Sequence, residues 1–461
     1  RAQMSMLGRL KPENFYDLVI EVAIVRPGPI VGKMVHPYLK RKRKLEEPYY
    51  PNEAVKNILG KTLGVPLFQE QIMKLAIELA DFTPGEADVL RKSINAWRSS
   101  APIKVIAKRL MDGLLKSGMS LDFANQIFEQ IQGFSHYGFP ESHAASFALL
   151  AYASCYLKCH HPAEFACALI NSQPMGFYRE DTILYEAIRA QVQVLPVSVL
   201  KSQWDCIIEK ENTIRLGFRL VKGLSQKSVE ALIQERNQMQ FKNLADFVKR
   251  SQLRSDILSK FALAGRFEDF SWNARESLWA LLEYQNLFMQ KDESQLSFFK
   301  HTSILESDHM NAQKFQSLSG FEYIQNDYSA FRVSVHGHPM AELRKNMNLP
   351  KTTAKDIRQM QTGSYVKTSG LVLIRQKPPT AKGVCFSTLE DESGFIDIIL
   401  WKNIFEQYRD DFLNHCFLIV EGVLQRDENT VSILVKKLRP IWNTRHMDDT
   451  PLALEPDQYF H

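Results

Sequence analysis

The first 200 residues carry apolar side chains at helical spacing and show few strand-like alternations. One stripe with this spacing predicts the core face of an amphipathic helix, and it consists of Leu121, Ala124, Ile127, Phe128 and Ile131. The segment 144–157 is apolar enough to predict a buried helix, but it is shorter than the roughly 18 apolar residues that a membrane span needs. We therefore expect residues 1–200 to form a mostly helical region.

A helix with a well-defined start is predicted directly after Thr83. Thr83, Pro84 at the first helical position and Glu86 together make a capping box. The core face beyond this cap carries Ala87, Leu90, Ile94 and Trp97, and the opposite face carries Arg91, Asn95 and Arg98. Guanidinium groups on one face suit a triphosphate or a template backbone. A solvated basic face is the alternative.

Residues 201–290 predict short helices joined by glycine turns, and 217–229 has the pattern of a helix-hairpin-helix. Gly223 has no Cβ and lets the backbone approach a phosphate, while Ser225 can cap the next helix, whose N–H groups attract anions. Lys222 and Lys227 add positive charge beside the turn. Such contacts hold the sugar–phosphate backbone without reading sequence. An ordinary glycine turn is the alternative, but a second helical pair at 243–250 and 255–264 favours DNA binding.

The pattern is mixed at 291–355, which predicts a linker with short elements, and then changes to strand-like alternation. Five strands are predicted at 365–375, 384–390, 395–401, 417–424 and 431–438, with a helix at 404–412 between the third and the fourth. This order is that of an OB-fold, which often binds single-stranded nucleic acid, with another small β-barrel as the alternative. We assign the OB-fold to 356–440 and a C-terminal tail to 441–461. The fold class is multidomain α+β.

Aromatic and positively charged side chains are what such a barrel needs to bind a single strand. The aromatic candidates are Tyr365, Phe386 and Trp401, and the cationic candidates are Lys367, Arg375, Lys377 and Lys382. Alternation along the second strand predicts that Phe386 and Val384 face the core, opposite Cys385 and Ser387. Because Lys377 and Lys382 lie in the loop between the first two strands, we expect charge in this loop, together with Arg375, to matter most for DNA binding.

Composition and charge change this picture little. The 461 residues are 45% hydrophobic and 24% charged, which is an ordinary soluble mixture with room for roughly two to four domains. The net charge of +5 is mild, so the five cations at 40–44 predict equally an exposed solvated loop or a phosphate contact. The six cysteines form no CxxC pair, and Cys155 and Cys159 are expected in the core, so we predict a reducing cytoplasm and no bound metal. The start at Arg1, without a signal sequence, predicts a fragment.

Four motifs in the N-terminal region are specific. They are the segments 23–29 (AIVRPGP), 67–73 (LFQEQIM), 87–93 (ADVLRKS) and 133–148 (GFSHYGFPESHAASFA). This ordered series resembles the fingers region of bacterial C-family DNA polymerases, the family of the polymerase III alpha subunit. The helix-hairpin-helix and the OB-fold follow in that family's order, so the resemblance covers nearly the whole chain. Segments 327–328, 336–340 and 383–391 look like the error-prone, damage-associated branch, and the tail resembles that branch's natural C-terminus.

The resemblance implies a DNA-directed DNA polymerase of damage tolerance and translesion synthesis that is cytoplasmic and associated with the nucleoid. In the family, three aspartates hold two magnesium ions, and the resemblance places them upstream of Arg1, so this fragment is expected to contain no catalytic residue. Nucleotide contacts are implied for Arg91, Lys92, Asn95, Tyr137 and His143, although relatives often have arginine where this chain has Lys92. The implied partners are primer–template duplex, single-stranded template and deoxynucleoside triphosphate, with no membrane.

A short segment past the hairpin region suggests a further partner. Gln295, Leu296, Phe298 and Phe299 are similar to the peptides that bind the sliding clamp, and they lie where the alpha subunit carries such a motif. A local hydrophobic anchor is the alternative, and the error-prone branch can also reach the clamp through accessory proteins. The competing function for the whole chain is a non-catalytic scaffold that binds DNA and docks on the clamp.

Overall fold

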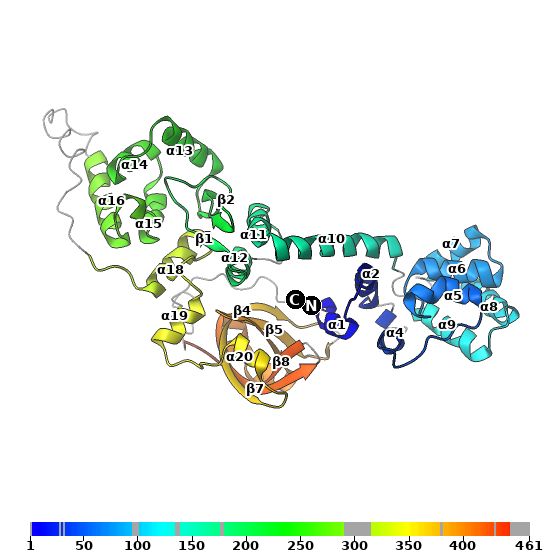
Figure 1. Cartoon of the computed structure of the whole chain (residues 1–461). Helices are drawn as coiled ribbons and strands as arrows, with labels where there is room; N and C mark the ends of the chain where they lie inside the picture. Colours follow the sequence, from blue (N-terminus) through cyan, green and yellow to red (C-terminus); the bar gives the residue numbers. More distant parts are fainter. Residues whose placement is uncertain are drawn as a thin grey trace. The chain divides into compact units, whose positions relative to one another are not determined.

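The computed structural model describes residues 2–26, 29–30, 33–94, 101–133, 139–175, 179–289, 315–378, 381–427 and 430–442. They form two compact units, the first ending at Tyr156 and the second beginning at Leu157 (Figure 1). The first unit has a single hydrophobic core, and the second has three core clusters. The fold class is therefore the predicted multidomain α+β.

The first unit is helical. Its helices are α1 (Ala2–Leu10), α2 (Phe15–Ile24), α4 (Val35–Lys42), α5 (Glu53–Leu59), η1 (Gly60–Thr62), α6 (Gln69–Ala80), α7 (Pro84–Ile94), α8 (Ala101–Lys116), α9 (Leu121–Gly133) and α10 (Glu141–His160). The predicted stripe on α9 is confirmed at Ala124 and Ile127, which are buried, whereas Leu121 at its start is exposed. Helices α6 and α8 pack closely at Gly113, where a Cβ would lie 2.3 Å from the Cβ of Ala80.

Helix α10 differs from the prediction of a buried helix over 144–157. Only Ala144 and Ala148 are buried, while Leu150 and Tyr156 are about half exposed or more. Cys155 and Cys159 are also exposed rather than in the core. The apolar side chains of α10 point to all sides of the helix, so no single apolar face directs it into a core.

The second unit begins with α11 (Pro162–Asn171) and α12 (Glu180–Arg189) and a small sheet that sequence analysis missed. Its strands are β1 (Gln193–Leu195), β2 (Ile207–Lys210) and β3 (Thr213–Arg215), in the order β1-β3-β2. Each strand is only three or four residues long, too short for a clear period of two. Gly217 follows this sheet, and a Cβ there would lie 2.4 Å from the carbonyl oxygen of Trp204.

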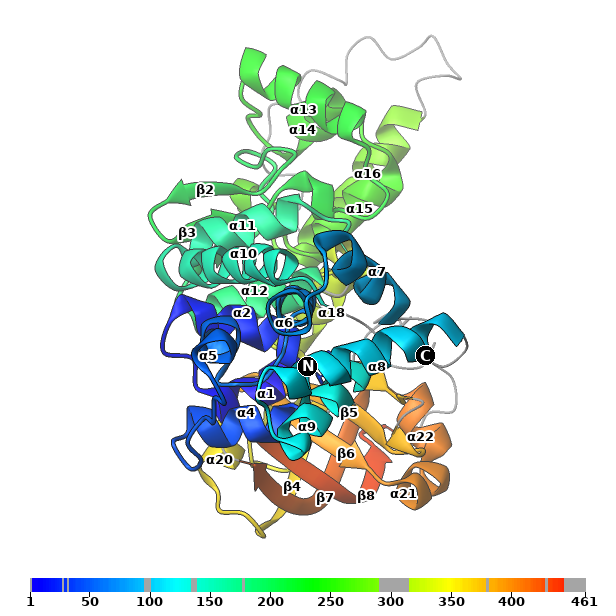
Figure 2. The same ribbon diagram turned by 90° about the vertical axis from the view of Figure 1, so that its right-hand side faces the viewer.

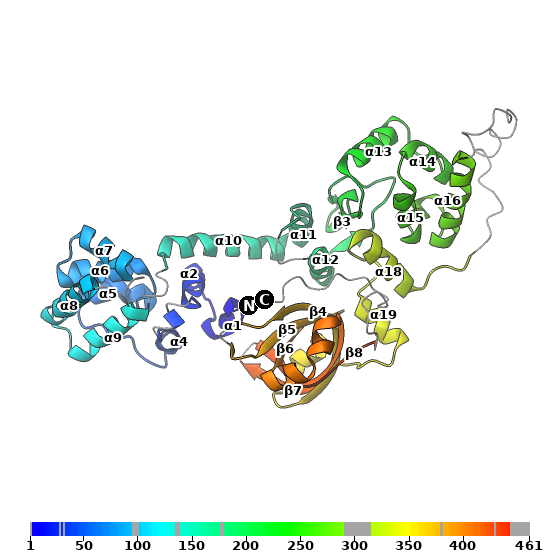
Figure 3. The same ribbon diagram turned by 180° about the vertical axis from the view of Figure 1, so that it is seen from behind.

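A group of helices follows, seen from behind in Figure 3. It comprises η3 (Phe218–Leu220), α13 (Gln226–Gln238), α14 (Leu244–Ser251), α15 (Ser255–Leu263), η4 (Glu268–Phe270) and α16 (Ala274–Met289). The predicted second helical pair is confirmed as α14, capped by Asn243, and α15. A core rich in phenylalanine, including Phe218, Phe247, Phe261 and Phe267, holds these helices together.

The segment predicted as a linker is more ordered than expected where it is described. It contains α18 (Gly320–Phe331), α19 (Pro339–Asn346) and the following α20 (Ala354–Gln359). Phe331 packs in the helical core, and Tyr328 and Met340 pack in a cluster with barrel residues. The polar residues of this segment made it look like a linker, but one of them, Asp327, is buried and forms an ion pair with Arg266.

The C-terminal domain is the predicted five-stranded barrel. Its strands are β4 (Tyr365–Gln376), β5 (Cys385–Asp391), β6 (Gly394–Leu400), β7 (Phe417–Asp427) and β8 (Thr430–Pro440), closed in the order β4-β5-β6-β8-β7. Two short helices, α21 (Lys402–Gln407) and α22 (Arg409–Asn414), stand where one helix was predicted. At Gly422 on β7, a Cβ would lie 2.2 Å from the carbonyl oxygen of Leu434 on β8, so the barrel closes tightly there.

The predicted orientation of the second barrel strand is wrong. Cys385, Ser387 and Leu389 are buried, while Phe386 and Val384 are only partly buried. The hydroxyl of Ser387 donates to the carbonyl of Ile374 at 2.6 Å, which satisfies this polar group inside the barrel. The small residues Cys385 and Ser387 take the inner side at the start of β5, and Phe386 lies on the outer side.

Candidate nucleic-acid interface

The hairpin predicted at 217–229 has the expected backbone. Gly223 has a φ of +83°, a conformation that glycine adopts without strain. Ser225 is the N-cap of α13, and its hydroxyl accepts a hydrogen bond from the N–H of Ser228 at 3.2 Å. The element before the turn is the short 3-10 helix η3. The turn and the capped helix start can therefore approach a phosphate group closely.

A second hairpin, between α14 and α15, lies against the first. Lys260 donates from Nζ to the carbonyl of Lys222 at 2.8 Å, and Arg254 donates from Nη2 to the carbonyl of Gly223 at 3.5 Å. The sequence pattern predicts this helical pair, but Arg254 and Lys260 were not among the predicted DNA contacts. Their positive charge at the start and in the middle of the second predicted helix was the available signal.

Four cations thus belong to the two hairpins, namely Lys222, Lys227, Arg254 and Lys260. Lys227 is exposed in the first turn of α13, whereas Lys222 is partly buried. Asp256 offsets part of this charge, since its carboxylate lies 3.1 Å from Arg254 and 3.8 Å from Lys260. The remaining positive charge beside a tight backbone turn suits the sugar–phosphate backbone of DNA.

The loop between β4 and β5 brings cations beside an exposed aromatic residue. A Cβ on Gly383 would lie 3.2 Å from the side chain of Lys402. Gly383 and the preceding, exposed Lys382 therefore lie against the start of α21. Trp401, the N-cap of α21, is 52% exposed. Lys377 stacks on Phe405, with Nζ 4.3 Å from the ring centre. The exposed ring of Trp401 and the loop lysines Lys377 and Lys382 offer the stacking and charge that binding of single-stranded nucleic acid needs.

Arg375 departs from the prediction that it contacts DNA. Strand β4 extends to Gln376, so Arg375 lies inside the strand, and its side chain points inward between the exposed Ile374 and Gln376. The guanidinium donates to the carbonyl of Phe412 at 2.8 Å and to that of His415 at 2.6 Å. Because it is only 3% exposed, we assign it to holding the barrel against α22.

The predicted nucleotide-binding residues lie on two helices. On α7, the side chains of Arg91 and Lys92 both bind the Asp88 carboxylate at 2.7 Å. These bonds lower the pKa of Asp88, and the bond from Lys92 has the larger effect. Exposed His143, in the first turn of α10, has ring centres of Phe139 and Phe147 at 5.1 Å and 4.6 Å. Asn95 and Tyr137 lie outside the described residues, so their common site with Arg91 stays a prediction.

The capping box that starts α7 is confirmed. The N–H of Thr83 donates to Glu86 at 2.8 Å, and the N–H of Glu86 donates to the Thr83 hydroxyl at 3.3 Å. Arg109 of α8 also pairs with Glu86 and, with the Thr83 bonds, lowers the pKa of Glu86 to about 2. This second helix fixes the position of the cap and therefore of the charged face beyond it.

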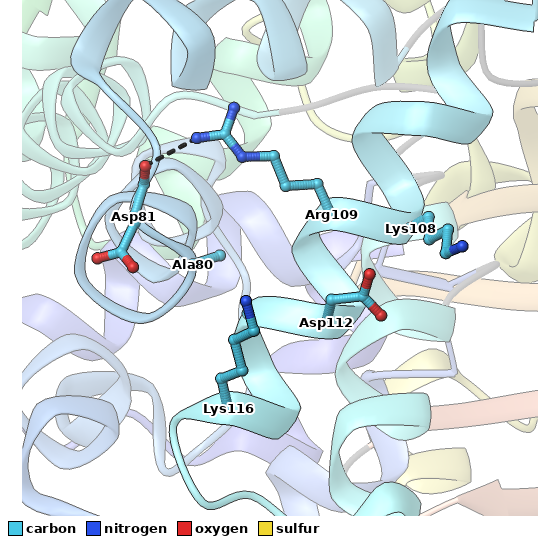
Figure 4. A pocket seen from close by; sticks show the side chains of 7 residues that line it. Ala80, Asp81, Lys108, Arg109, Asp112 and Lys116 are labelled. Carbon is cyan, nitrogen blue, oxygen red and sulfur yellow. Dashed lines mark hydrogen bonds between the residues drawn. The ribbon is translucent and has the colours of Figure 1, made fainter.

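A shallow cavity of about 560 Å³ lies between the end of α6 and α8 (Figure 4). It is lined by Ala80, Asp81, Lys108, Arg109, Asp112, Gly113 and Lys116. Arg109 donates to the carbonyl of Asp81 at 2.9 Å, so its charge is already used within the protein. With cations and carboxylates both in its walls, the cavity has no clear preference for an anion.

The basic run at 40–44 is largely engaged within the protein, although Lys40 and Lys44 are exposed. Its first three residues end α4, and Lys42 binds the buried Asp17 at 2.7 Å. Arg41 donates to the carbonyl of Leu63 at 2.8 Å, and Arg43 donates to that of Arg9 at 2.9 Å. Three of the five cations therefore hold the helical unit together.

Among the described residues, no group of three or more His, Cys, Asp or Glu side chains could hold a metal ion. The magnesium that the resemblance implies would have its ligands upstream of Arg1, so it stays a prediction. Within the same residues, no helix is both long and apolar enough to cross a membrane. The predicted clamp peptide, Gln295 to Phe299, and the tail beyond Trp442 lie outside the described residues.

Three family models match the chain in the order of these domains. The bacterial DNA polymerase III alpha subunit finger domain matches residues 1–118, the helix-hairpin-helix motif matches 191–277, and the OB-fold nucleic acid binding domain matches 366–441. The error-prone DNA polymerase of Bdellovibrio bacteriovorus is 42% identical over 458 residues, which are 96% of this chain and 43% of that relative. This chain belongs to the bacterial C-family DNA polymerases.

Other relatives place this C-family chain in the error-prone branch. The error-prone DNA polymerases of Alkalilimnicola ehrlichii and Pseudomonas fluorescens are each 43% identical over 443 residues, 95% of this chain and 42% of each relative. The C-family chain thus spans less than half the length of the relatives it matches. The resemblance found in the sequence motifs is confirmed.

Proposed function

We propose that this chain holds DNA and the incoming nucleotide for an error-prone DNA polymerase of damage tolerance and translesion synthesis. The observation that carries the proposal is the hairpin at Gly223, with its positive φ and four surrounding cations, in a chain 42% identical to error-prone polymerases. A turn of this kind holds duplex backbone without reading sequence, as a polymerase must. The proposed place of action is the cytoplasm, at the nucleoid.

Each domain takes one partner in this proposal. The two hairpins bind primer–template duplex, and the loop with Lys377 and Lys382 beside Trp401 binds single-stranded template. Arg91 and Lys92, with Asn95, Tyr137 and His143, bind the triphosphate, in exchange for the present bonds to Asp88. The sliding clamp at Gln295 to Phe299, and accessory proteins, remain proposed partners.

Nucleotidyl transfer is proposed for the intact polymerase, with the magnesium ligands in the part of the relatives that this chain does not cover. The described residues offer no carboxylate cluster for that chemistry. The second candidate function is a DNA-binding and clamp-docking scaffold that never catalyses transfer, for which the helix-hairpin-helix and the OB-fold would suffice. Restoring polymerase activity by adding the missing region of a relative would separate the two candidates.

The duplex contact is tested by charge reversal at the hairpin. Lys222→Glu with Lys227→Glu should weaken binding of the purified chain to a labelled duplex by roughly tenfold or more at low salt, and weaken single-strand binding less. The control reverses the exposed Lys201 and Lys210 of the same unit, which leaves the hairpin intact. Fluorescence anisotropy measures both, and equal losses on duplex and single strand would contradict a duplex-specific hairpin.

A further inference from the structure

A second basic surface lies on the barrel, away from the loop between β4 and β5. Strands β4, β7 and β8 are neighbours in the closed barrel and lie side by side in Figure 2. Their outer side carries a group of charged residues around one aromatic ring. We call this group the β4–β7–β8 face, and it consists of Tyr365, Lys367, Glu421, Lys436, Lys437 and Arg439.

Strand pairing brings the first three of these residues together. Lys367 lies opposite Glu421, with Nζ 2.9 Å from the carboxylate, and the hydroxyl of Tyr365 donates to Glu421 at 3.3 Å. The hydrogen bond from Lys367 and, more weakly, the charge of Lys437 lower the pKa of Glu421. Lys437 of β8 therefore belongs to the same surface as the two residues of β4.

An irregularity in β8 adds a further cation. Val435 and Leu438 both point into the core, so the two residues between them, Lys436 and Lys437, are both exposed. Arg439 is exposed on the same strand. Within the described part of the chain, no ion pair occupies Lys436, Lys437 or Arg439, so four cations face a single carboxylate.

The strands that OB-folds commonly use for nucleic acid differ sharply from this face. Strands β5 and β6 contain no lysine or arginine, and the outer side of β6 carries Asp397, which accepts from Thr388 at 2.7 Å. The far part of β4 and β7 is covered, since Leu371 and Ile419 pack in a cluster with Tyr328. The exposed ring of Tyr365, 57% accessible, thus stands beside the main positive charge of these strands.

We propose that a single strand of DNA runs along the β4–β7–β8 face, with its phosphates on Lys367, Lys436, Lys437 and Arg439 and a base stacked on Tyr365. An exposed aromatic ring beside Lys436, Lys437 and Arg439, which form no ion pair within the described residues, favours a nucleic acid over an acidic protein segment, because bases stack on such rings. The proposal rests on the proposed DNA-binding function and extends it to a surface distinct from the loop at Lys382.

Cross-linking tests the base contact. A photoreactive benzoylphenylalanine replaces Tyr365 in one variant and Trp401 in another, and each is irradiated with a labelled oligothymidylate. Cross-links at position 365 support the proposal. Cross-links at 401 without any at 365 overturn it and leave the loop site standing. If neither position cross-links and the chain binds no oligonucleotide, the proposed DNA-binding function fails as well.

Salt dependence tests the phosphate contacts. Lys436→Ala with Lys437→Ala should reduce the slope of log affinity against log salt by about 1.4, or about 0.7 for each phosphate lost. The control removes the same charge at the exposed Lys351 and Lys355 and should leave the slope nearly unchanged. Equal slopes for the two double variants, with unaltered thermal unfolding, would overturn the proposal and leave an acidic protein segment as the partner for these cations.

Discussion

At the scale of single residues, Gly223 is the position on which the hairpin depends. Its φ of +83° is strained for any residue with a Cβ, although the space around it would accept one, since the nearest atom lies 3.6 Å away. The cost of a substitution therefore comes from the backbone conformation. That conformation also brings the carbonyl of Gly223 to Arg254 of the second hairpin.

Gly223→Ala should lower the free energy of unfolding by about 1 kcal/mol and weaken duplex binding. Gly363→Ala is the matched control, because Gly363 has a φ of +88° with open space around it and lies before β4. Both variants should lose similar stability in urea unfolding, but only the hairpin variant should lose affinity for duplex. Similar loss of affinity in both would mean that stability, not hairpin geometry, governs binding.

A buried carboxyl group in the helical unit makes stability depend on pH. Glu21 of α2 is 7% exposed, and burial raises its pKa from 4.5 to about 7. The folded protein keeps this proton to a higher pH than the unfolded chain does. The contribution of Glu21 protonation to the free energy of unfolding is therefore complete below pH 4.5 and is lost as pH rises through 7.

Glu21→Gln keeps the group neutral, so the variant should gain roughly 1–3 kcal/mol of stability over the parent between pH 5 and pH 8. Thermal unfolding across this range measures the difference. Glu78→Gln, at an exposed position of α6, should show no such change with pH. A pH-independent difference for Glu21→Gln would show that Glu21 titrates normally.

At the scale of elements, the sequence predicted what short-range chemistry determines. The capping box at Thr83, the cap at Ser225 and the five barrel strands are all set by residues within a few positions of one another. The orientation of β5 was not predictable in this way, because both of its sides carry apolar residues. Which side is inner depends on neighbouring strands, as the bond from Ser387 to Ile374 shows.

Arg375 and Lys382 should separate stability from binding within the barrel. Arg375→Ala leaves two carbonyl groups without their charged donor, so it should cost about 2–4 kcal/mol in urea unfolding. Lys382→Ala with Lys402→Ala should change stability little and lower single-strand affinity severalfold at low salt. Unchanged stability in Arg375→Ala would contradict its assignment to the barrel interior.

At the scale of the whole chain, the order of the domains was predictable from motifs. The basic run at 40–44 is a possible DNA contact by its sequence, yet three of its cations bind Asp17, Leu63 and Arg9, which are distant in sequence. The same holds for the segment at 315–355, which the polar residues around the buried Asp327 made resemble a linker. Hydrogen bonds and ion pairs between residues distant in sequence are what sequence patterns do not reveal.

The purified chain by itself should not extend a primer, since the magnesium ligands are proposed to lie in the part of the relatives that this chain does not cover. A primer-extension assay with magnesium and all four nucleotides measures this, with a full-length error-prone relative as the positive control. Steady incorporation by the chain alone would contradict the proposal that the magnesium ligands lie outside this chain. Binding of the same primer–template should persist, because it depends on the hairpins and the barrel.

The tight closure of the barrel at Gly422 has a genetic consequence. Any Cβ there would collide with the carbonyl oxygen of Leu434, which belongs to the backbone and cannot rotate away. Every single-nucleotide change in a glycine codon is either silent or introduces a residue with a Cβ or a stop. Every single-nucleotide change of this codon that alters the protein should therefore disrupt the barrel. A saturation library selected for folded barrels should retain glycine alone at position 422.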